Sequence, residues 1–122
     1  MRNESSNSVR IWSPRASRDE LVAHLRARVR ELARLLPVRQ AVLFGSWARG
    51  RATARSDVDV LVIYADPPRP DAYALVWRAL QTPGLEPHVY AESEAIAIQK
   101  MLERMTAGGI DLLSPPPDAE HC

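Results

Sequence analysis

The sequence predicts an α/β (α+β) domain in which a small mixed β-sheet is flanked by helices. Helical and strand patterns alternate along the chain in the order α-β-α-β-α-β-α, which is typical of helices layered over a sheet. Three short apolar runs, at 38–44, 58–64 and 85–90, have the length and composition of strands. The chain of 122 residues is 46% hydrophobic, enough for one buried core.

The first half of the chain opens with a polar segment, residues 1–16, that predicts a flexible N-terminal arm. A capping box of Ser17 and Glu20 then predicts the start of a helix, and Pro37 predicts its end. Apolar residues with helical spacing form one face of this helix: Leu21, Leu25, Val29, Leu32 and Leu36. The strand at 38–44 follows directly.

The second half contains a helix at 71–80, and four of its residues are expected to form its buried side: Tyr73, Val76, Trp77 and Leu80. In the strand at 85–90, Pro87 removes a backbone donor, which predicts an edge position or a bulge.

The last helix is expected to begin with Ser93 as its cap and to end at Gly108-Gly109. Its apolar face contains four residues: Ala95, Ile98, Leu102 and Met105. A short edge strand is expected at 110–113. We therefore predict one domain over residues 17–113 and a disordered tail over residues 114–122.

Composition and charge argue against several classes of protein. The net charge of +1 makes a large nucleic-acid interface unexpected. No apolar run approaches the roughly 20 residues of a membrane span, and the polar stretch from Met1 to Ser8 lacks the pattern of a signal peptide. The single cysteine, Cys122, has no partner for an internal disulfide. We therefore expect a protein of the reducing cytoplasm.

Two acidic side chains lie at the start of the strand at 58–64. Asp57 and Asp59 are two residues apart, so they point to the same face of an extended chain. Neighbouring carboxylates on an otherwise apolar strand repel each other and lose hydration. A divalent cation between them offsets this cost, and Mg²⁺ takes one or two protein carboxylates together with water and substrate phosphate. The pair therefore predicts a site for Mg²⁺ or Mn²⁺.

A Gly45-Ser46 turn follows the first strand and is expected to open a short helix at 47–51. Free N–H groups at such a turn, together with the helix dipole, favour a phosphate. Gly45 permits close approach of the backbone, and Ser46 adds a hydroxyl. Arg49 either contacts phosphate or pairs with an acid that fixes the turn. Trp47 either stacks on a base or packs in the core.

These residues resemble a known signature. Gly45-Ser46-Trp47-Ala48-Arg49-Gly50, followed by Ser56-Asp57-Val58-Asp59, is similar to the motif of the nucleotidyltransferase superfamily of DNA polymerase beta. The small stand-alone members of that superfamily, the minimal nucleotidyltransferases, are the most similar group, and the order of elements matches over most of residues 18–107. The resemblance implies the nucleotidyltransferase fold and transfer of a nucleoside monophosphate, with ATP as the expected donor and pyrophosphate leaving.

The resemblance also implies a third acid on the following strand, which activates the attacking hydroxyl and helps to hold a second metal ion. The candidate is Glu86, where the family more often has aspartate. By alternation, Glu86, His88 and Tyr90 share one face of the strand. His88 is the alternative base or ligand, unless it is a half-buried histidine with a structural hydrogen bond.

The acceptor is expected to come from a partner or from a second copy, because the chain is short for an added acceptor domain. Minimal nucleotidyltransferases commonly act as antitoxins of a small helical HEPN-domain protein, and some transfer AMP to a tyrosine of that partner. The first hypothesis is therefore an antitoxin of the protein adenylyltransferase type. Two alternatives remain: a non-catalytic antitoxin that neutralises its partner by contact, and a homodimeric transferase for a small molecule.

Overall fold

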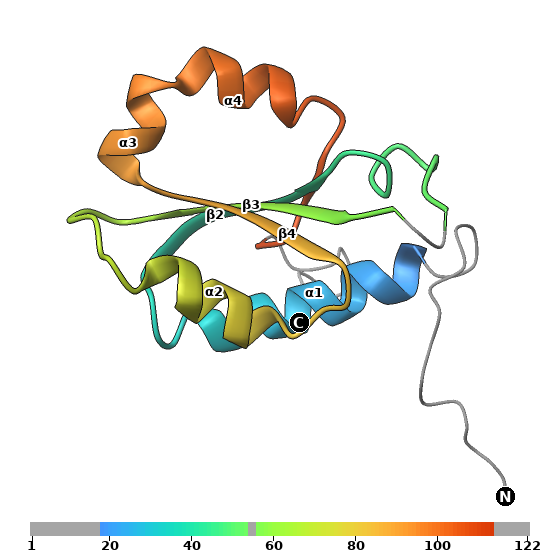
Figure 1. The fold of residues 1–122 in the computed structure, drawn as a ribbon, viewed down its shortest axis with the longest axis horizontal. Helices are drawn as coiled ribbons and strands as arrows, with labels where there is room; N and C mark the ends of the chain where they lie inside the picture. Colours follow the sequence, from blue (N-terminus) through green and yellow to red (C-terminus); the bar gives the residue numbers. More distant parts are fainter. Residues whose placement is uncertain (1–17, 54–55, 114–122) are drawn as a thin grey trace, which may run out of the picture.

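A four-stranded mixed sheet forms the centre of the molecule, with helices on both of its faces (Figure 1). The computed structural model describes residues 18–53 and 56–113. Its elements are α1 (Arg18–Leu32), β2 (Val38–Phe44), β3 (Val58–Tyr64), α2 (Ala72–Leu80), β4 (Leu85–Ala91), α3 (Glu92–Ala97), α4 (Gln99–Met105) and β5 (Ile110–Asp111). The predicted fold class is confirmed.

The strand order is β4-β3-β2-β5. β3 runs antiparallel to β2 and parallel to β4. The start of β3 therefore lies between the end of β2 and the start of β4, and Asp59 is opposite Phe44 on one side and opposite Glu86 on the other. β4 is an edge strand, as Pro87 predicts, and its pairing with β3 is continuous. β5 forms the other edge and is shorter than predicted.

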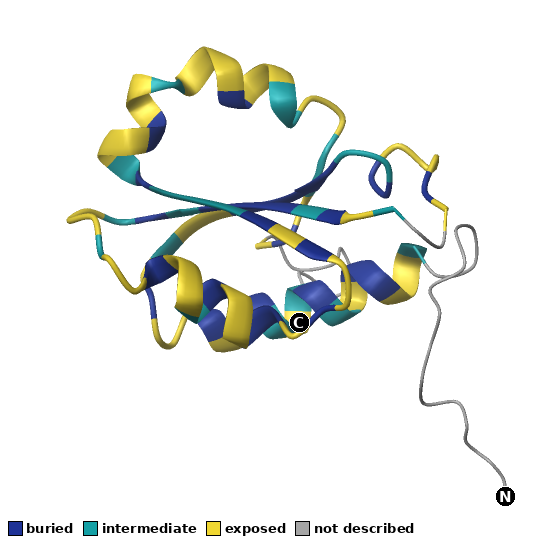
Figure 2. Cartoon of the chain, in the orientation of Figure 1, coloured by how far each residue is buried: buried dark blue, intermediate teal, exposed yellow. Residues whose placement is uncertain are grey.

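The larger core lies between the sheet and the pair α1 and α2. The whole predicted apolar face of the first helix is buried: Leu21, Leu25, Val29, Leu32 and Leu36. The predicted end at Pro37 is wrong, because α1 ends at Leu32 and Leu36 lies in the turn that follows. The apolar face packs with the even-numbered residues of β3 from Val58 to Tyr64. Figure 2 shows buried residues along the sheet and on the sides of α1 and α2 that face it. Full burial of a leucine or valine contributes about 1.5–3 kcal/mol, so this cluster fixes α1 against the sheet.

The opposite face of the sheet carries a smaller cluster under α3 and α4: Val42, Phe44, Leu61, Ala95 and Leu102. Ile98 and Met105 pack against it, as the predicted face of the last helix requires. The odd-numbered residues of β3 alternate onto this face, so Asp59 lies on it as well. The acidic end of β3 is thus on the side of the sheet that has the smaller core.

The predicted buried side of α2 is half wrong. Val76 and Leu80 are buried, but Tyr73 and Trp77 are 54% and 50% exposed. Alanines occupy the remaining buried positions of the helix, Ala72 and Ala79. These small side chains let the helix backbone lie close to its neighbours, which two large rings in the same positions would prevent.

The helix predicted at 47–51 does not form. The chain there makes consecutive hydrogen-bonded turns. Gly50, with a φ of 73°, leaves the right-handed helical region, so the turn cannot continue as a helix.

The last predicted helix is two helices, separated at Ile98, where φ is −123°. Its predicted cap is also wrong, because the N-cap of α3 is Ala91 and Ser93 lies inside the helix. The Ser93 hydroxyl instead donates a hydrogen bond of 2.8 Å to Asp66. Glu94 accepts the Ala91 N–H at 2.8 Å and satisfies the helix start in place of a serine.

The predicted arm at 1–16, the Ser17 cap and the tail at 114–122 lie outside the described residues. None of the helices within 18–53 and 56–113 combines the length and the hydropathy that crossing a membrane requires.

Candidate active site

Gly45 is the first residue after β2, and its backbone lies against the carboxylate of Asp59. A Cβ added to Gly45 would lie 2.5 Å from Asp59 Oδ2, far inside van der Waals contact. The φ of Gly45 is 80°, a conformation that residues with a side chain rarely adopt. Both the lack of space for a side chain and the backbone conformation therefore require glycine at this position. The turn and the carboxylate lie in direct contact.

Hydrogen bonds within the turn leave three consecutive N–H groups unpaired. The N–H of Arg49 donates to Gly45 O at 3.1 Å, and the N–H of Arg51 donates to Ser46 O at 2.9 Å. Within the described residues, the N–H groups of Ser46, Trp47 and Ala48 donate no hydrogen bond. The dipole of a following helix is missing, so the predicted phosphate cradle depends on these local N–H groups.

Arg18, the first residue of α1, anchors the turn although it is far away in sequence. Its Nη1 donates to Ala48 O at 3.1 Å. A Cβ on Gly50 would lie 3.6 Å from the same nitrogen. Arg18 could not be identified from the sequence, because it is 30 residues away from Ala48 and belongs to no motif.

The structure decides between the two roles of Trp47. Its side chain is 2% exposed and belongs to the core under α1 and α2, so base stacking is excluded. Arg49 is exposed, and among the described residues it forms no ion pair with an acid. Its contact with phosphate stays a prediction.

Three carboxylates gather where β3 and β4 begin. Asp59 is opposite Glu86 in the parallel register, at the roughly 4.8 Å spacing of neighbouring strands, and Asp57 immediately precedes β3. Burial raises the pKa of Asp59 above its ordinary value of 3.8, the charges of Asp57 and Glu86 add to this increase, and His88 opposes it. Glu86 and Asp57 are exposed.

His88 approaches Asp59 more closely than the sequence could indicate. Its Nε2 lies 3.6 Å from Asp59 Oδ1. The imidazole ring also packs against Phe44, with ring centroids 5.1 Å apart and a 58° angle between the ring planes. His88 thus bridges the end of β2 and the acidic start of β3.

The donor set fits a magnesium ion that is shared with a nucleotide. Among the described residues, no three histidine, cysteine or acidic side chains converge closely enough to hold an ion by themselves. Mg²⁺ needs only one or two protein carboxylates when phosphate and water supply its other ligands. Asp57 and Asp59 would hold such an ion beside Gly45, where a Cβ would fill the space. The predicted roles of these acids and of Glu86 stay predictions.

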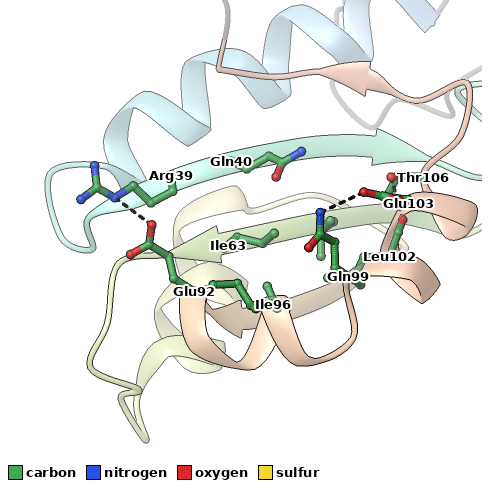
Figure 3. A pocket seen from close by; sticks show the side chains of 11 residues that line it. Arg39, Gln40, Ile63, Glu92, Ile96, Gln99, Leu102, Glu103 and Thr106 are labelled. Atoms are coloured by element: carbon green, nitrogen blue, oxygen red, sulfur yellow. Dashed lines mark hydrogen bonds and ion pairs between the residues drawn. The ribbon is translucent and has the colours of Figure 1, made fainter.

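A separate pocket of about 380 Å³ lies between β2, β3 and the helices α3 and α4 (Figure 3). Leu61 and Ile63 contribute to its apolar lining, and an ion pair of 3.5 Å between Arg39 and Glu92 lies at one end. None of the predicted site residues lines it. Its arginine is already paired with an acid, which argues against a phosphate site.

Comparisons with known proteins identify the family and the fold. The sequence matches the model of the nucleotidyltransferase domain over residues 25–115. A Sulfolobus solfataricus protein assigned as a nucleotidyltransferase has a similar structure, with 19% identity, a TM-score of 0.59 and coverage of 85% of this chain and 89% of that one. A comparison with curated proteins finds no match.

Two further structures with the same fold come from toxin–antitoxin proteins. A chain from a mutant form of MntA-HepT is 18% identical, and a chain from a toxin–antitoxin with AMP-PNP is 21% identical. Each has a TM-score of 0.52, and each match covers 79% of this chain and 78% of the other. The matched family model spans most of the sequence, so the chain belongs to the nucleotidyltransferase domain family.

Proposed function

We propose that this protein is a metal-dependent nucleotidyltransferase that moves AMP from ATP to a hydroxyl of an acceptor. The observation that carries the proposal is the contact between the Gly45 turn and the Asp59 carboxylate, with Asp57 beside it. A phosphate on the N–H groups of the turn would lie next to the two acids. Nucleotidyl transfer requires this combination, because a divalent cation links carboxylates to phosphate oxygens.

In this proposal the chain's own residues bind and orient the reactants. The turn at Gly45 and Ser46, with Arg49, holds the β- and γ-phosphates. Asp57 and Asp59 would hold Mg²⁺ or Mn²⁺, which would supply positive charge against the charge that develops on the phosphate oxygens. The acceptor oxygen forms a bond to the α-phosphorus while the bond to the pyrophosphate oxygen breaks. Glu86, exposed at the edge strand, accepts the proton of the acceptor hydroxyl.

The proposed acceptor is a small helical protein of the HEPN type, which would make this chain the antitoxin of a toxin–antitoxin pair. Support comes from the two toxin–antitoxin structures of the same fold. Exposed apolar residues offer contacts for such a partner: Trp77, Ile96 and Met101 are 50%, 71% and 44% exposed. Exposed aromatic side chains are frequent anchors of protein interfaces.

A second candidate is a non-catalytic antitoxin that binds nucleotide but transfers nothing. The observation in its favour is that Glu86 is exposed and joins no three-residue metal set within the described part of the chain. Such a site would hold a metal–nucleotide complex on two acids without positioning a base.

Labelled ATP tests the proposal directly. The protein is incubated with ATP and Mg²⁺, alone and with a candidate helical partner of the HEPN type, and the mass of each product is measured by mass spectrometry. Addition of AMP to the partner, lost in Asp57→Asn/Asp59→Asn, is the expected result. A stable complex without transfer would support the non-catalytic candidate. Transfer to a small molecule by the isolated protein would support the homodimeric alternative.

A further inference from the structure

His88 is the one nitrogen-bearing side chain that the structure brings against the acids of the site, within the residues described. The register of β3 and β4 pairs Leu61 with His88 and Asp59 with Glu86. Even so, the close approach to Asp59 is made by His88, at 3.6 Å, two residue pairs farther along the strands. Glu86 is exposed, whereas the side chain of His88 is only 29% exposed.

Contacts on one side restrict the orientation of the His88 ring. Its face is held against Phe44, the residue that precedes the Gly45 turn. Its Nε2 is buried and has no hydrogen-bond partner among the described residues. A buried polar atom without a partner is costly, and the nearest candidate acceptor is the Asp59 carboxylate. A shift of a few tenths of an ångström would bring the two atoms within hydrogen-bond distance.

We propose that His88 is a positioning residue, which donates from Nε2 to Oδ1 of Asp59 and thereby directs Oδ2 toward the metal beside Gly45. The inference rests on the proposed function, because it needs a metal at Asp59. The carboxylate otherwise rotates about its Cβ–Cγ bond and presents either oxygen in several directions. A ligating carboxylate that is fixed by an outer hydrogen bond binds its metal more tightly. Glu86 is then left free to accept a proton.

Binding of Mn²⁺ in the presence of AMP-PNP tests the proposal without reference to turnover. Electron paramagnetic resonance measures the free Mn²⁺ that remains. His88→Phe keeps a ring against Phe44 but removes the donor. We expect its Mn²⁺ affinity to fall by about 10–100-fold, the usual effect of removing an outer hydrogen bond at a metal site.

A pair of amide variants provides the matched control. The amide nitrogen of glutamine lies as many bonds from Cα as Nε2 of histidine, whereas that of asparagine corresponds to Nδ1. His88→Gln should therefore keep the affinity within a few-fold, and His88→Asn should lose it as His88→Phe does. If His88 had only a structural role, the two amide variants would have the same Mn²⁺ affinity. Thermal unfolding confirms that each variant is folded.

Affinity in His88→Phe that equals or exceeds that of the wild type overturns the positioning role. Equal Mn²⁺ affinities in His88→Gln and His88→Asn also overturn the positioning role. This comparison remains valid even when His88→Phe does not fold. Either result leaves the proposed function intact as long as the wild-type protein binds Mn²⁺ and AMP-PNP. A wild-type protein that binds neither contradicts the proposed function, and the role of His88 with it.

Discussion

Gly45 and Asp59 lie so close together that position 45 has no room for a side chain. The carboxylate Oδ2 would be 2.5 Å from a Cβ, and the positive φ independently disfavours any residue other than glycine. The two residues are 14 positions apart in sequence and meet because β2 and β3 pair antiparallel, with Phe44 opposite Asp59. The antiparallel pairing of β2 and β3 thus brings the turn that is expected to bind phosphate into contact with the acid that is expected to bind the metal.

Gly45→Ala should lower both the free energy of unfolding and the affinity for nucleotide. The backbone strain alone amounts to about 1–2 kcal/mol, and displacement of the Asp59 carboxylate adds to it. Chemical denaturation measures the first effect, and calorimetry with ATP and Mg²⁺ measures the second.

Gly108→Ala is the matched control for this change. Gly108 has a similar φ of 78°, but a Cβ there meets nothing within 4 Å. We expect comparable backbone strain without any loss of nucleotide affinity. Equal loss of affinity in both variants would contradict a specific contact between Gly45 and Asp59.

Asp59→Asn should stabilise the protein at neutral pH when metal is absent. The pKa of Asp59 is raised above 3.8, chiefly by burial, so the folded state binds this proton more tightly than the unfolded state does. The free energy of unfolding therefore falls as the pH rises from the pKa of Asp59 in the unfolded state through its pKa in the folded state. It stays lower at higher pH. The asparagine side chain does not ionise, so the Asp59→Asn variant does not lose this stability.

Thermal unfolding in EDTA at pH 7 and at about pH 3 measures the effect, since the gain should shrink where Asp59 is protonated in both states. A variant that is less stable than the wild type at pH 7 without metal would show that the contact with His88 outweighs burial. Equal gains at both pH values would point to a cause other than ionisation.

The strands were predictable from the sequence because each one is a short apolar run bounded by a proline, a glycine or polar residues. β2 and β3 have the predicted bounds. The face of α2 was not predictable in the same way. Helical spacing allows both Tyr73 with Trp77 and Ala72 with Ala79 on the buried side, and only the closeness of the neighbouring elements selects the alanines.

The site was predictable only in its local motifs. The turn at Gly45 and the acids Asp57 and Asp59 are near one another in sequence, so their pattern could be read directly. The approach of His88 to Asp59 depends on how β3 and β4 pair, which no local pattern contains. The contact of Arg18 with the turn depends on where α1 packs, so it could not be read either.

Glu86→Gln should reduce transfer far more than nucleotide binding. A general base contributes mainly in the transition state, typically by about 10²–10⁴-fold. Rates of AMP transfer to the partner and the affinity for ATP are compared in the same preparation. Normal transfer by this variant would remove Glu86 from the proposed mechanism and leave His88 as the alternative base on β4.

Trp77→Ala should weaken the complex with the helical partner and leave folding almost unchanged. The side chain is half exposed, and substitutions at such surface positions usually change the free energy of unfolding by less than about 0.5 kcal/mol. Loss of an aromatic interface anchor should lower the partner affinity about tenfold or more.

Leu80→Ala, on the buried side of the same helix, should behave in the opposite way. Leu80 is 0% exposed, so this change should cost about 2–5 kcal/mol of stability. Unchanged partner affinity in Trp77→Ala would exclude this side of α2 from the interface.

The most direct test of the central claim is calorimetry with ATP, with and without Mg²⁺, on the wild-type protein and on Asp57→Asn/Asp59→Asn. The claim is that the Gly45 turn and these two acids form one metal-dependent nucleotide site. We expect the wild-type protein to bind ATP more tightly with Mg²⁺ than without it, and the double variant to fold but to lose this binding. Equal binding of ATP by both proteins, or binding that does not depend on the metal, would contradict the account.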